Sequence, residues 1–137
     1  MTPGPKLMSD LPVVLLRFRR YSVAIAGDIS EMFLQIEMEP EDRPFHRILT
    51  EDPKGKVVEL EAERFIFGDS GAVNASVGTI FVHALSYIEK MPATVDTVIN
   101  STIIDDHIDS RKTKEDAVNL VEDLKDMYAD AGMTVRK

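Results

Sequence analysis

Apolar residues recur at three- and four-residue spacing in three stretches of the chain, a pattern typical of helices with one buried face. The first stretch spans residues 6–18, where Pro12 is expected to interrupt the helix. The second spans residues 70–91. The third, residues 113–131, opens on a Thr-x-x-Asp start signal and is followed by Gly132, a common helix stop. The pattern therefore predicts three helices.

Short apolar runs rich in β-branched residues lie between these helices and favour strands. One or two helical turns are expected over residues 30–36, and residues 101–110 predict a hairpin with an Asp-Asp pair at its tip. Single strands are expected at residues 22–28, 45–50, 57–61 and 64–67, with a turn at 52–55. Together the elements predict an α+β fold, an antiparallel sheet with helices packed on one face.

Composition narrows the class of protein. The 137 residues predict one domain, residues 1–137, large enough to bury its own core. The chain has no cysteine, no apolar run long enough to span a membrane and no signal-peptide pattern at its start, so an intracellular location in cytoplasm or nucleus is expected. The formal net charge of −8 argues against a stand-alone nucleic-acid binder, because such binding depends on cations that neutralise phosphates.

Candidate chemistry is concentrated in three aspartates beside apolar strands. Asp28 ends the first predicted strand, and Asp105 and Asp106 occupy the hairpin tip. Carboxylates in such places are costly unless they are paired, hydrogen-bonded or left at a solvent edge. If the three converge, a bound divalent cation would relieve their repulsion, and paired metals sharing carboxylates serve polymerases and nucleases. The alternative is that each is an ordinary turn residue, since aspartate is common in turns.

Five segments, taken in order and spacing, extend this picture. They are Asp28-Ile-Ser-Glu-Met-Phe-Leu-Gln-Ile36, Glu41-Asp-Arg-Pro-Phe-His-Arg47, Phe65-Ile-Phe-Gly68, Ile103-Ile-Asp-Asp106 and Ala131-Gly-Met-Thr-Val-Arg-Lys137. The set resembles the palm of reverse transcriptases, most closely that of BEL/Pao LTR retrotransposons, over about residues 4–137. The resemblance implies a polymerase palm with a ferredoxin-like, RRM-like core.

The resemblance also implies a metal site. Asp28 matches the first metal-binding aspartate of the family, and the resemblance implies that the backbone carbonyl of Ile29 would be an additional ligand. Asp105 and Asp106 match the paired acids of the catalytic hairpin. Together they would bind two Mg²⁺ or Mn²⁺ ions and transfer a nucleotide to a primer 3′-hydroxyl.

Four further residues match substrate-binding positions of the family. Phe33 matches the steric gate that favours deoxynucleotides, although its spacing also fits an ordinary core phenylalanine. Phe67 and Gly68 begin the segment that cradles template and nucleotide, and Lys137 falls where the family has a lysine near the phosphates. The implied partners are an RNA or DNA template-primer and deoxynucleotide triphosphates.

The chain departs from the family pattern in three ways. Ile103 replaces the aromatic residue before the paired acids, and Ala72-Val73 lacks the usual proline. Against the family pattern, these residues are expected to lack most of the fingers and all of the thumb. The expectation is therefore a retrotransposon-derived palm fragment with weak activity or none alone. The alternatives are a catalytically silent, domesticated remnant that binds a protein partner or a second copy, and a non-catalytic metal-binding domain.

Overall fold

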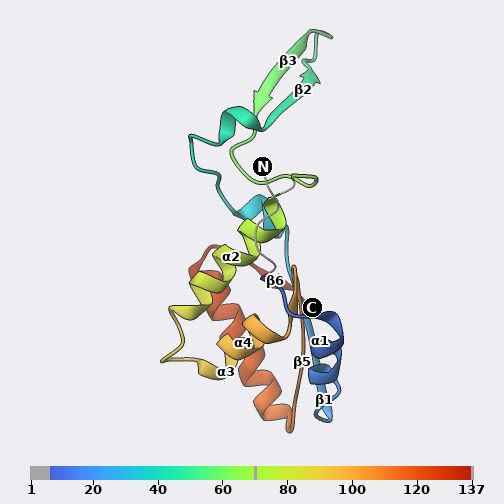
Figure 1. Cartoon of the computed structure of the whole chain (residues 1–137), viewed down its shortest axis with the longest axis vertical. Coiled ribbons are helices and arrows are strands. Elements are labelled where there is room, and N and C mark those ends of the chain that lie inside the picture. The colour runs from blue at the N-terminus through green and yellow to red at the C-terminus, as the bar shows by residue number, and fades with distance from the viewer. Residues whose placement is uncertain (1–6, 70, 137) are drawn as a thin grey trace.

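The computed structural model describes residues 7–69 and 71–136 (Figure 1). Its helices and strands follow one another along the chain with two short 3₁₀ helices, η1 and η2, among them. In order they are α1 (Leu11–Phe18), β1 (Val23–Ile29), η1 (Met32–Gln35), η2 (Arg43–Phe45), β2 (Arg47–Glu51), β3 (Val57–Glu61), α2 (Ala72–Leu85), α3 (Pro92–Asn100), β4 (Thr102–Ile103), β5 (Asp106–Arg111), α4 (Lys114–Asp130) and β6 (Val135–Arg136).

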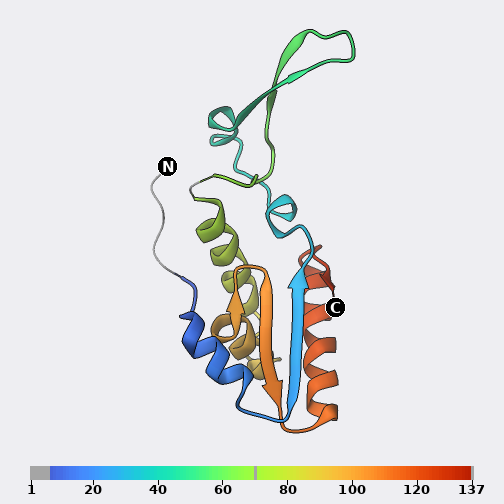
Figure 2. The ribbon, with the colours of Figure 1, turned by 90° about the vertical axis from the view of Figure 1, so that its right-hand side faces the viewer.

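A four-stranded antiparallel sheet in the order β4-β5-β1-β6 forms the centre of the molecule. Figure 2 shows α2, α3 and α4 behind this sheet. Strand β1 explains the layering, because Ile25 and Ile29 are buried under the helices while Ala24 and Ala26 are exposed on the other face. The predicted α+β fold is confirmed.

Helix α1 departs from the expectation that all helices share one face. The hydroxyl of Ser110, which is directly opposite Ala24, donates to the backbone carbonyl of Arg17 at 2.8 Å. Paired residues of an antiparallel ladder point to the same face, so α1 covers part of the face opposite the other helices. The rest of that face, around Ala24 and Ala26, stays open to solvent.

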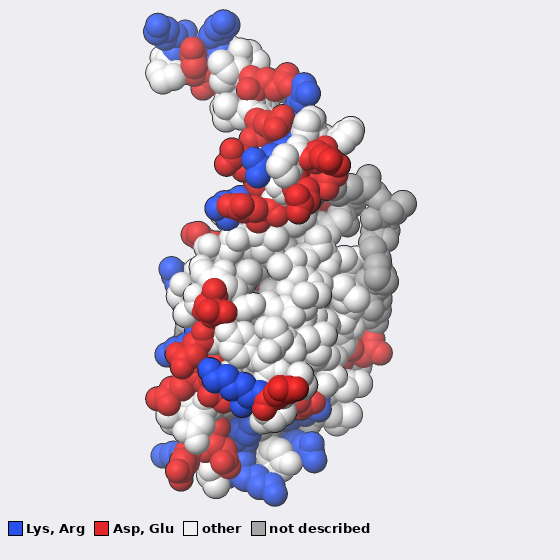
Figure 3. Space-filling model, turned by 90° about the vertical axis from the view of Figure 1, so that its left-hand side faces the viewer, with Lys and Arg blue, Asp and Glu red and all other residues white. Residues whose placement is uncertain are grey.

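The core lies between the sheet and the helices α2, α3 and α4. Its largest fully buried side chains include Tyr128 and Met127 of α4, Ile29 of β1 and Val95 and Val98 of α3. Burying each of the large apolar side chains contributes roughly 1.5–3 kcal/mol relative to exposure. Figure 3 shows that the helical side of the molecule carries a broad uncharged surface, with acidic and basic side chains gathered along its margins and at its two ends.

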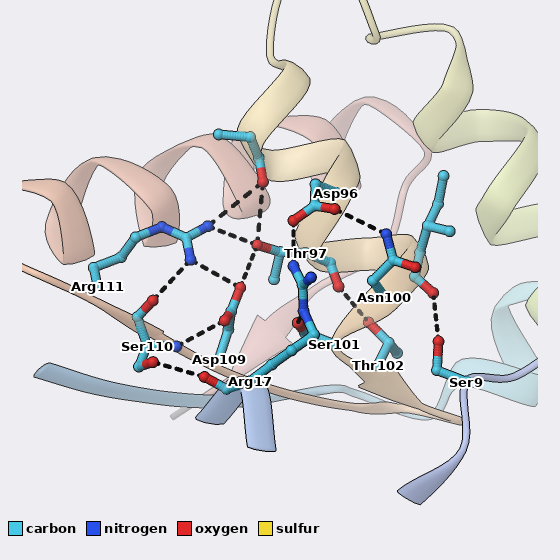
Figure 4. A network of polar contacts seen from close by, with 12 residues as sticks. Ser9, Arg17, Asp96, Thr97, Asn100, Ser101, Thr102, Asp109, Ser110 and Arg111 are labelled. Carbon is cyan, nitrogen blue, oxygen red and sulfur yellow. Dashed lines mark hydrogen bonds and ion pairs between the residues drawn. The ribbon is translucent and has the colours of Figure 1, made fainter. Parts of the chain in front are cut away.

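A polar network joins α3 to the sheet (Figure 4). Asp109 of β5 is buried, and its carboxylate accepts hydrogen bonds from Thr97 at 2.7 Å and from Arg111 at 2.8 Å. Arg17 of α1 donates to the Ser101 hydroxyl at 2.8 Å and forms an ion pair with Asp96. The charge of Asp109 is thus compensated, and Arg17 connects α1 to α3.

Strands β2 and β3 form a separate two-stranded hairpin that extends away from the rest of the molecule (Figures 1 and 2). We call residues 47–61 the hairpin arm. The Asp52 carboxylate accepts from the backbone N–H groups of Lys54 and Lys56 at 2.8 and 2.9 Å, and Gly55 has a φ of 76°. The predicted strand 57–61 is confirmed, while its partner begins at Arg47 because Phe45 belongs to η2.

Two predictions in the first half of the chain are wrong. Pro12 does not interrupt a helix, because α1 begins at Leu11 and Pro12 occupies its first turn, where a missing N–H costs nothing. Residues 64–67 do not form a strand. Arg64 makes a single bridge to Glu37, after which the chain turns at Gly68, whose φ is 101°.

The helix predicted over residues 70–91 is shorter and is followed by a helix that the pattern missed. Helix α2 ends at Leu85, and the next residues form i→i+3 turns up to Pro92, which disfavours helical backbone at Met91 and starts α3. The apolar pattern missed α3 because Thr94 and Thr97 fill two of its core positions. It also missed β6, which has only two residues.

The last helix is confirmed. Helix α4 runs from Lys114 to Asp130, the N-cap hydroxyl of Thr113 accepts from the Asp116 N–H at 3.1 Å, and Gly132 has a φ of 72°. Within the described ranges, none of the helices is both long and apolar enough to cross a membrane.

Candidate functional site

Strand register brings the three candidate aspartates to one end of the sheet. Asp28 of β1 is directly opposite Asp106 of β5. Such partners have Cα atoms about 4.5–5.5 Å apart and side chains on the same face, here the face that α2–α4 leave uncovered. The N–H of Ile29 donates to the carbonyl oxygen of Asp105 at 2.9 Å, which holds the hairpin turn against β1.

The environment of these acids is partly solvated. Asp28 and Asp105 are half-buried, whereas Asp106 is exposed. Asp28 is also directly opposite Arg136 of β6, so a guanidinium shares its face of the sheet. Solvent and a neighbouring cation together reduce the cost of placing carboxylates beside one another.

Backbone strain marks the hairpin turn between β4 and β5. Ile104 has a φ of 58°, a conformation that a β-branched residue rarely adopts and that costs on the order of 1–3 kcal/mol. The turn places Asp105 between the two strands, next to Ile29. The predicted hairpin with its acids at the tip is confirmed, and its tip is the strained segment.

A pocket of about 320 Å³ adjoins the hairpin turn. It is lined by three of the four candidate substrate residues together with one candidate catalytic acid and several neighbours: Phe33, Ile66, Phe67, Gly68, Asp69, Ala72, Val73, Ile104 and Asp105. These residues come from η1, the turn before α2, the first turn of α2 and the hairpin tip. The fold therefore brings segments 28–33, 66–69 and 103–106 together.

The two aromatic residues of the pocket differ in exposure. Phe33 is 7% exposed and Phe67 is 84% exposed. Their rings meet edge to face with centroids 4.9 Å apart. Phe67 thus stands at the rim of the pocket, and Phe33 belongs to the core as well as to the pocket lining.

Five residues that line this pocket were not candidate site residues in the sequence, and two of them, Ile104 and Asp69, shape its walls. Ile104 lines it through its strained turn, and Asp69 lines it through a carboxylate that lies 3.0 Å from Nδ1 of buried His46. The Asp69 carboxylate also accepts from the N–H of Ile66, which stabilises the turn that carries Phe67. The sequence offers little signal for this pairing, because residues 46 and 69 lie on different segments.

The three aspartates have the right donor atoms for a metal ion, but their side chains do not form an assembled cluster. Three carboxylates at one sheet end are the hard oxygen donors that Mg²⁺ and Mn²⁺ prefer. Over residues 7–69 and 71–136, however, no group of three acidic, histidine or cysteine side chains is gathered closely enough to hold an ion. Lys137, the expected phosphate-side lysine, lies outside the described residues.

Comparison with known proteins leaves the family open. No protein-family model matches the chain, and no curated protein matches it. The geometry of the sheet end is therefore the basis for a functional assignment: two aspartates directly opposite each other in a strand pair, a third in the adjoining turn, and a partly aromatic pocket beside them.

Proposed function

We propose that this chain is the palm of an RNA-directed DNA polymerase of the reverse transcriptase superfamily, resembling that of BEL/Pao retrotransposons. The finer description of the fold belongs to the same proposal, a polymerase palm with a ferredoxin-like, RRM-like core. The single observation that carries it is the position of Asp28 directly opposite Asp106 at one sheet end, with Asp105 in the adjoining turn beside a pocket that Phe33 and Phe67 line.

The open face of the sheet gives this site access to a large substrate. Helices α2–α4 cover the opposite face, so half-buried Asp28 and exposed Asp106 lie on the face that these helices leave open. A primer end would lie on the open face beside these acids, and the sugar and base of an incoming deoxynucleotide would occupy the pocket. Phe33 would approach the sugar from the floor of the pocket, and exposed Phe67 would contact the base at its rim.

Asp28, Asp105 and Asp106, with the carbonyl of Ile29, would hold divalent cations. When bound, Mg²⁺ or Mn²⁺ would activate the primer 3′-hydroxyl and neutralise the triphosphate. The protein residues would orient the reactants and concentrate negative charge where the cations are needed. No side chain needs to form a covalent bond with the substrate.

Among residues 7–69 and 71–136 the acids do not gather into a cluster that could hold an ion, and this favours a second candidate, a catalytically silent remnant of such a palm that acts through protein association. The two candidates differ in their response to metal and to a primer-template.

The test measures primer extension on an RNA template with deoxynucleotides and Mn²⁺ or Mg²⁺, together with the melting temperature with and without the metal. An active palm should extend the primer slowly, and millimolar metal should raise its melting temperature by mass action. Asp28→Asn should abolish both effects. Asp126→Asn, on the exposed side of α4, is the matched control and should leave both unchanged.

A metal-dependent stabilisation that Asp28→Asn removes, without extension, would favour a metal-binding site that needs further subdomains for catalysis. Absence of both extension and stabilisation would contradict the proposal and favour the silent remnant. Equal effects of Asp28→Asn and Asp126→Asn would contradict the assignment of the site.

A further inference from the structure

The hairpin arm is exposed on both faces. Leu49 is 71% exposed, Val57 is 62% exposed and Leu60 is 52% exposed. Within the described part of the chain, β2 and β3 pair only with each other. An isolated two-stranded hairpin is marginally stable in water, and an unpaired strand edge is a template for another strand. The arm is therefore a surface that gains stability from added contacts.

The two faces of the arm differ in charge. Ile48 is directly opposite Leu60, and Thr50 is opposite Val58, so one face carries no charged side chain along the ladder. All the charged residues of the two strands lie on the other face: Arg47, Glu51, Glu59 and Glu61. An added strand that continues the uncharged face must place apolar residues in the same alternation.

Strand β2 meets this requirement when it pairs with itself. In an antiparallel pair of two β2 strands centred on Leu49, Arg47 of each copy is opposite Glu51 of the other. Ile48 is then opposite Thr50, which extends the uncharged face across both copies. Opposite charges directly across an antiparallel pair are stabilising, and like charges are destabilising.

Strand β3 does not pair as favourably with a second copy of itself. In the register centred on its middle residue, Glu59 would be opposite Glu59 of the other copy. Its charged residues are both acidic, Glu59 and Glu61, so two β3 strands bring only negative charge together. Strand β2 carries one arginine and one glutamate, and two β2 strands are therefore electrically balanced.

From this complementarity we propose that the hairpin arm binds a second copy of the same chain, with β2 pairing antiparallel to β2 of the other copy about Leu49. The product is a four-stranded sheet in the order β3-β2-β2-β3. Arg47 already pairs with Glu59 of its own hairpin, and a guanidinium has enough donors to serve a second carboxylate. This inference is independent of the proposed polymerase activity, since none of these residues lines the acidic site.

The register predicts a specific pattern among charge variants, measured by analytical ultracentrifugation over a range of concentrations. The wild-type chain should form dimers. Arg47→Glu places Glu opposite Glu51, and Glu51→Arg places Arg opposite Arg47, so each variant alone should dimerise about tenfold more weakly. An equimolar mixture should regain wild-type association, because both cross-strand pairs are then of opposite charge.

The control is Lys54→Glu in the turn of the arm, which changes the net charge as much as Arg47→Glu and should leave dimerisation unchanged. Arg47→Glu also removes the contact of Arg47 with Glu59, so circular dichroism checks that the arm of this variant still folds. Glu51→Arg keeps that contact and tests the same cross-strand pair. A wild-type chain that stays monomeric up to about 1 mM overturns the proposal. Variants that associate like the wild type, or a mixture that does not regain association, overturn it as well.

Discussion

Among single residues, His107 is notable as a titratable side chain buried in the core. Its side chain is buried against Tyr128, with ring centroids 5.2 Å apart, and Nδ1 lies 2.6 Å from the Thr102 hydroxyl. Among the described residues Nε2 has no hydrogen-bond partner. Burial lowers the pKa of His107 to about 4, because the charged imidazolium is excluded from the core.

This shift predicts a pH dependence of stability. The unfolded chain binds the His107 proton near the ordinary histidine pKa of about 6.5, whereas the folded chain resists it until about pH 4. Unfolding is therefore favoured as the pH falls through this window. Between pH 7 and pH 4.5, the free energy of unfolding should fall by about 2 kcal/mol more in the wild type than in His107→Gln. Urea denaturation at both pH values measures this difference. Equal decreases in the wild type and in His107→Gln would contradict a buried neutral imidazole.

The residues of the candidate site differ in how clearly the sequence marks them. Asp28, Asp105 and Asp106 were identifiable because carboxylates beside apolar strands require an explanation, and the strand register places them together. Asp69 and Ile104 were not identifiable. Asp69 acts through a contact with His46 on another segment, and Ile104 acts through a backbone conformation that its side chain disfavours.

At the scale of elements, α4 shows why its boundaries were predictable. The Thr113 hydroxyl accepts from the Asp116 N–H at 3.1 Å and donates to the Asp116 carboxylate at 2.7 Å. Thr113→Ala should lower the free energy of unfolding by about 1 kcal/mol, because the helix loses its N-cap. Chemical denaturation measures this change.

The matched control for the cap is Thr79→Ala, inside α2. Thr79 is exposed, and its hydroxyl donates to the backbone carbonyl of Ala75 in its own helix. Because alanine has the higher helix propensity, this variant should be neutral or slightly stabilising. A loss in Thr79→Ala as large as that in Thr113→Ala would argue against a specific capping effect.

Elements with local signals were predicted, and elements that depend on distant contacts were not. Helix α4 and the hairpin of β4 and β5 have caps, turns and periodic apolar residues of their own. Helix α3 buries Thr94 and Thr97, and Thr97 is satisfied by Asp109 on β5, so its core face does not look apolar in sequence. Strand β6 exists because it pairs with the end of β1.

For the whole molecule, the main contrast is between a packed body and an arm without a core. The body surrounds a sheet covered by α2, α3 and α4, whereas the arm holds the exposed side chains of β2 and β3 away from it (Figure 2). The arm should therefore open without unfolding the body.

Amide hydrogen exchange tests this division. At low protein concentration, the amides of β2 and β3 should exchange orders of magnitude faster than those of β1 and β5, because a two-stranded hairpin without a core opens at little free-energy cost. At high concentration, pairing between copies should protect β2 more than β3, since only the β2 edge is covered. Glu51→Arg should remove this added protection and leave β1 unchanged. Uniform exchange across body and arm would mean that the arm is stabilised by contacts within its own chain.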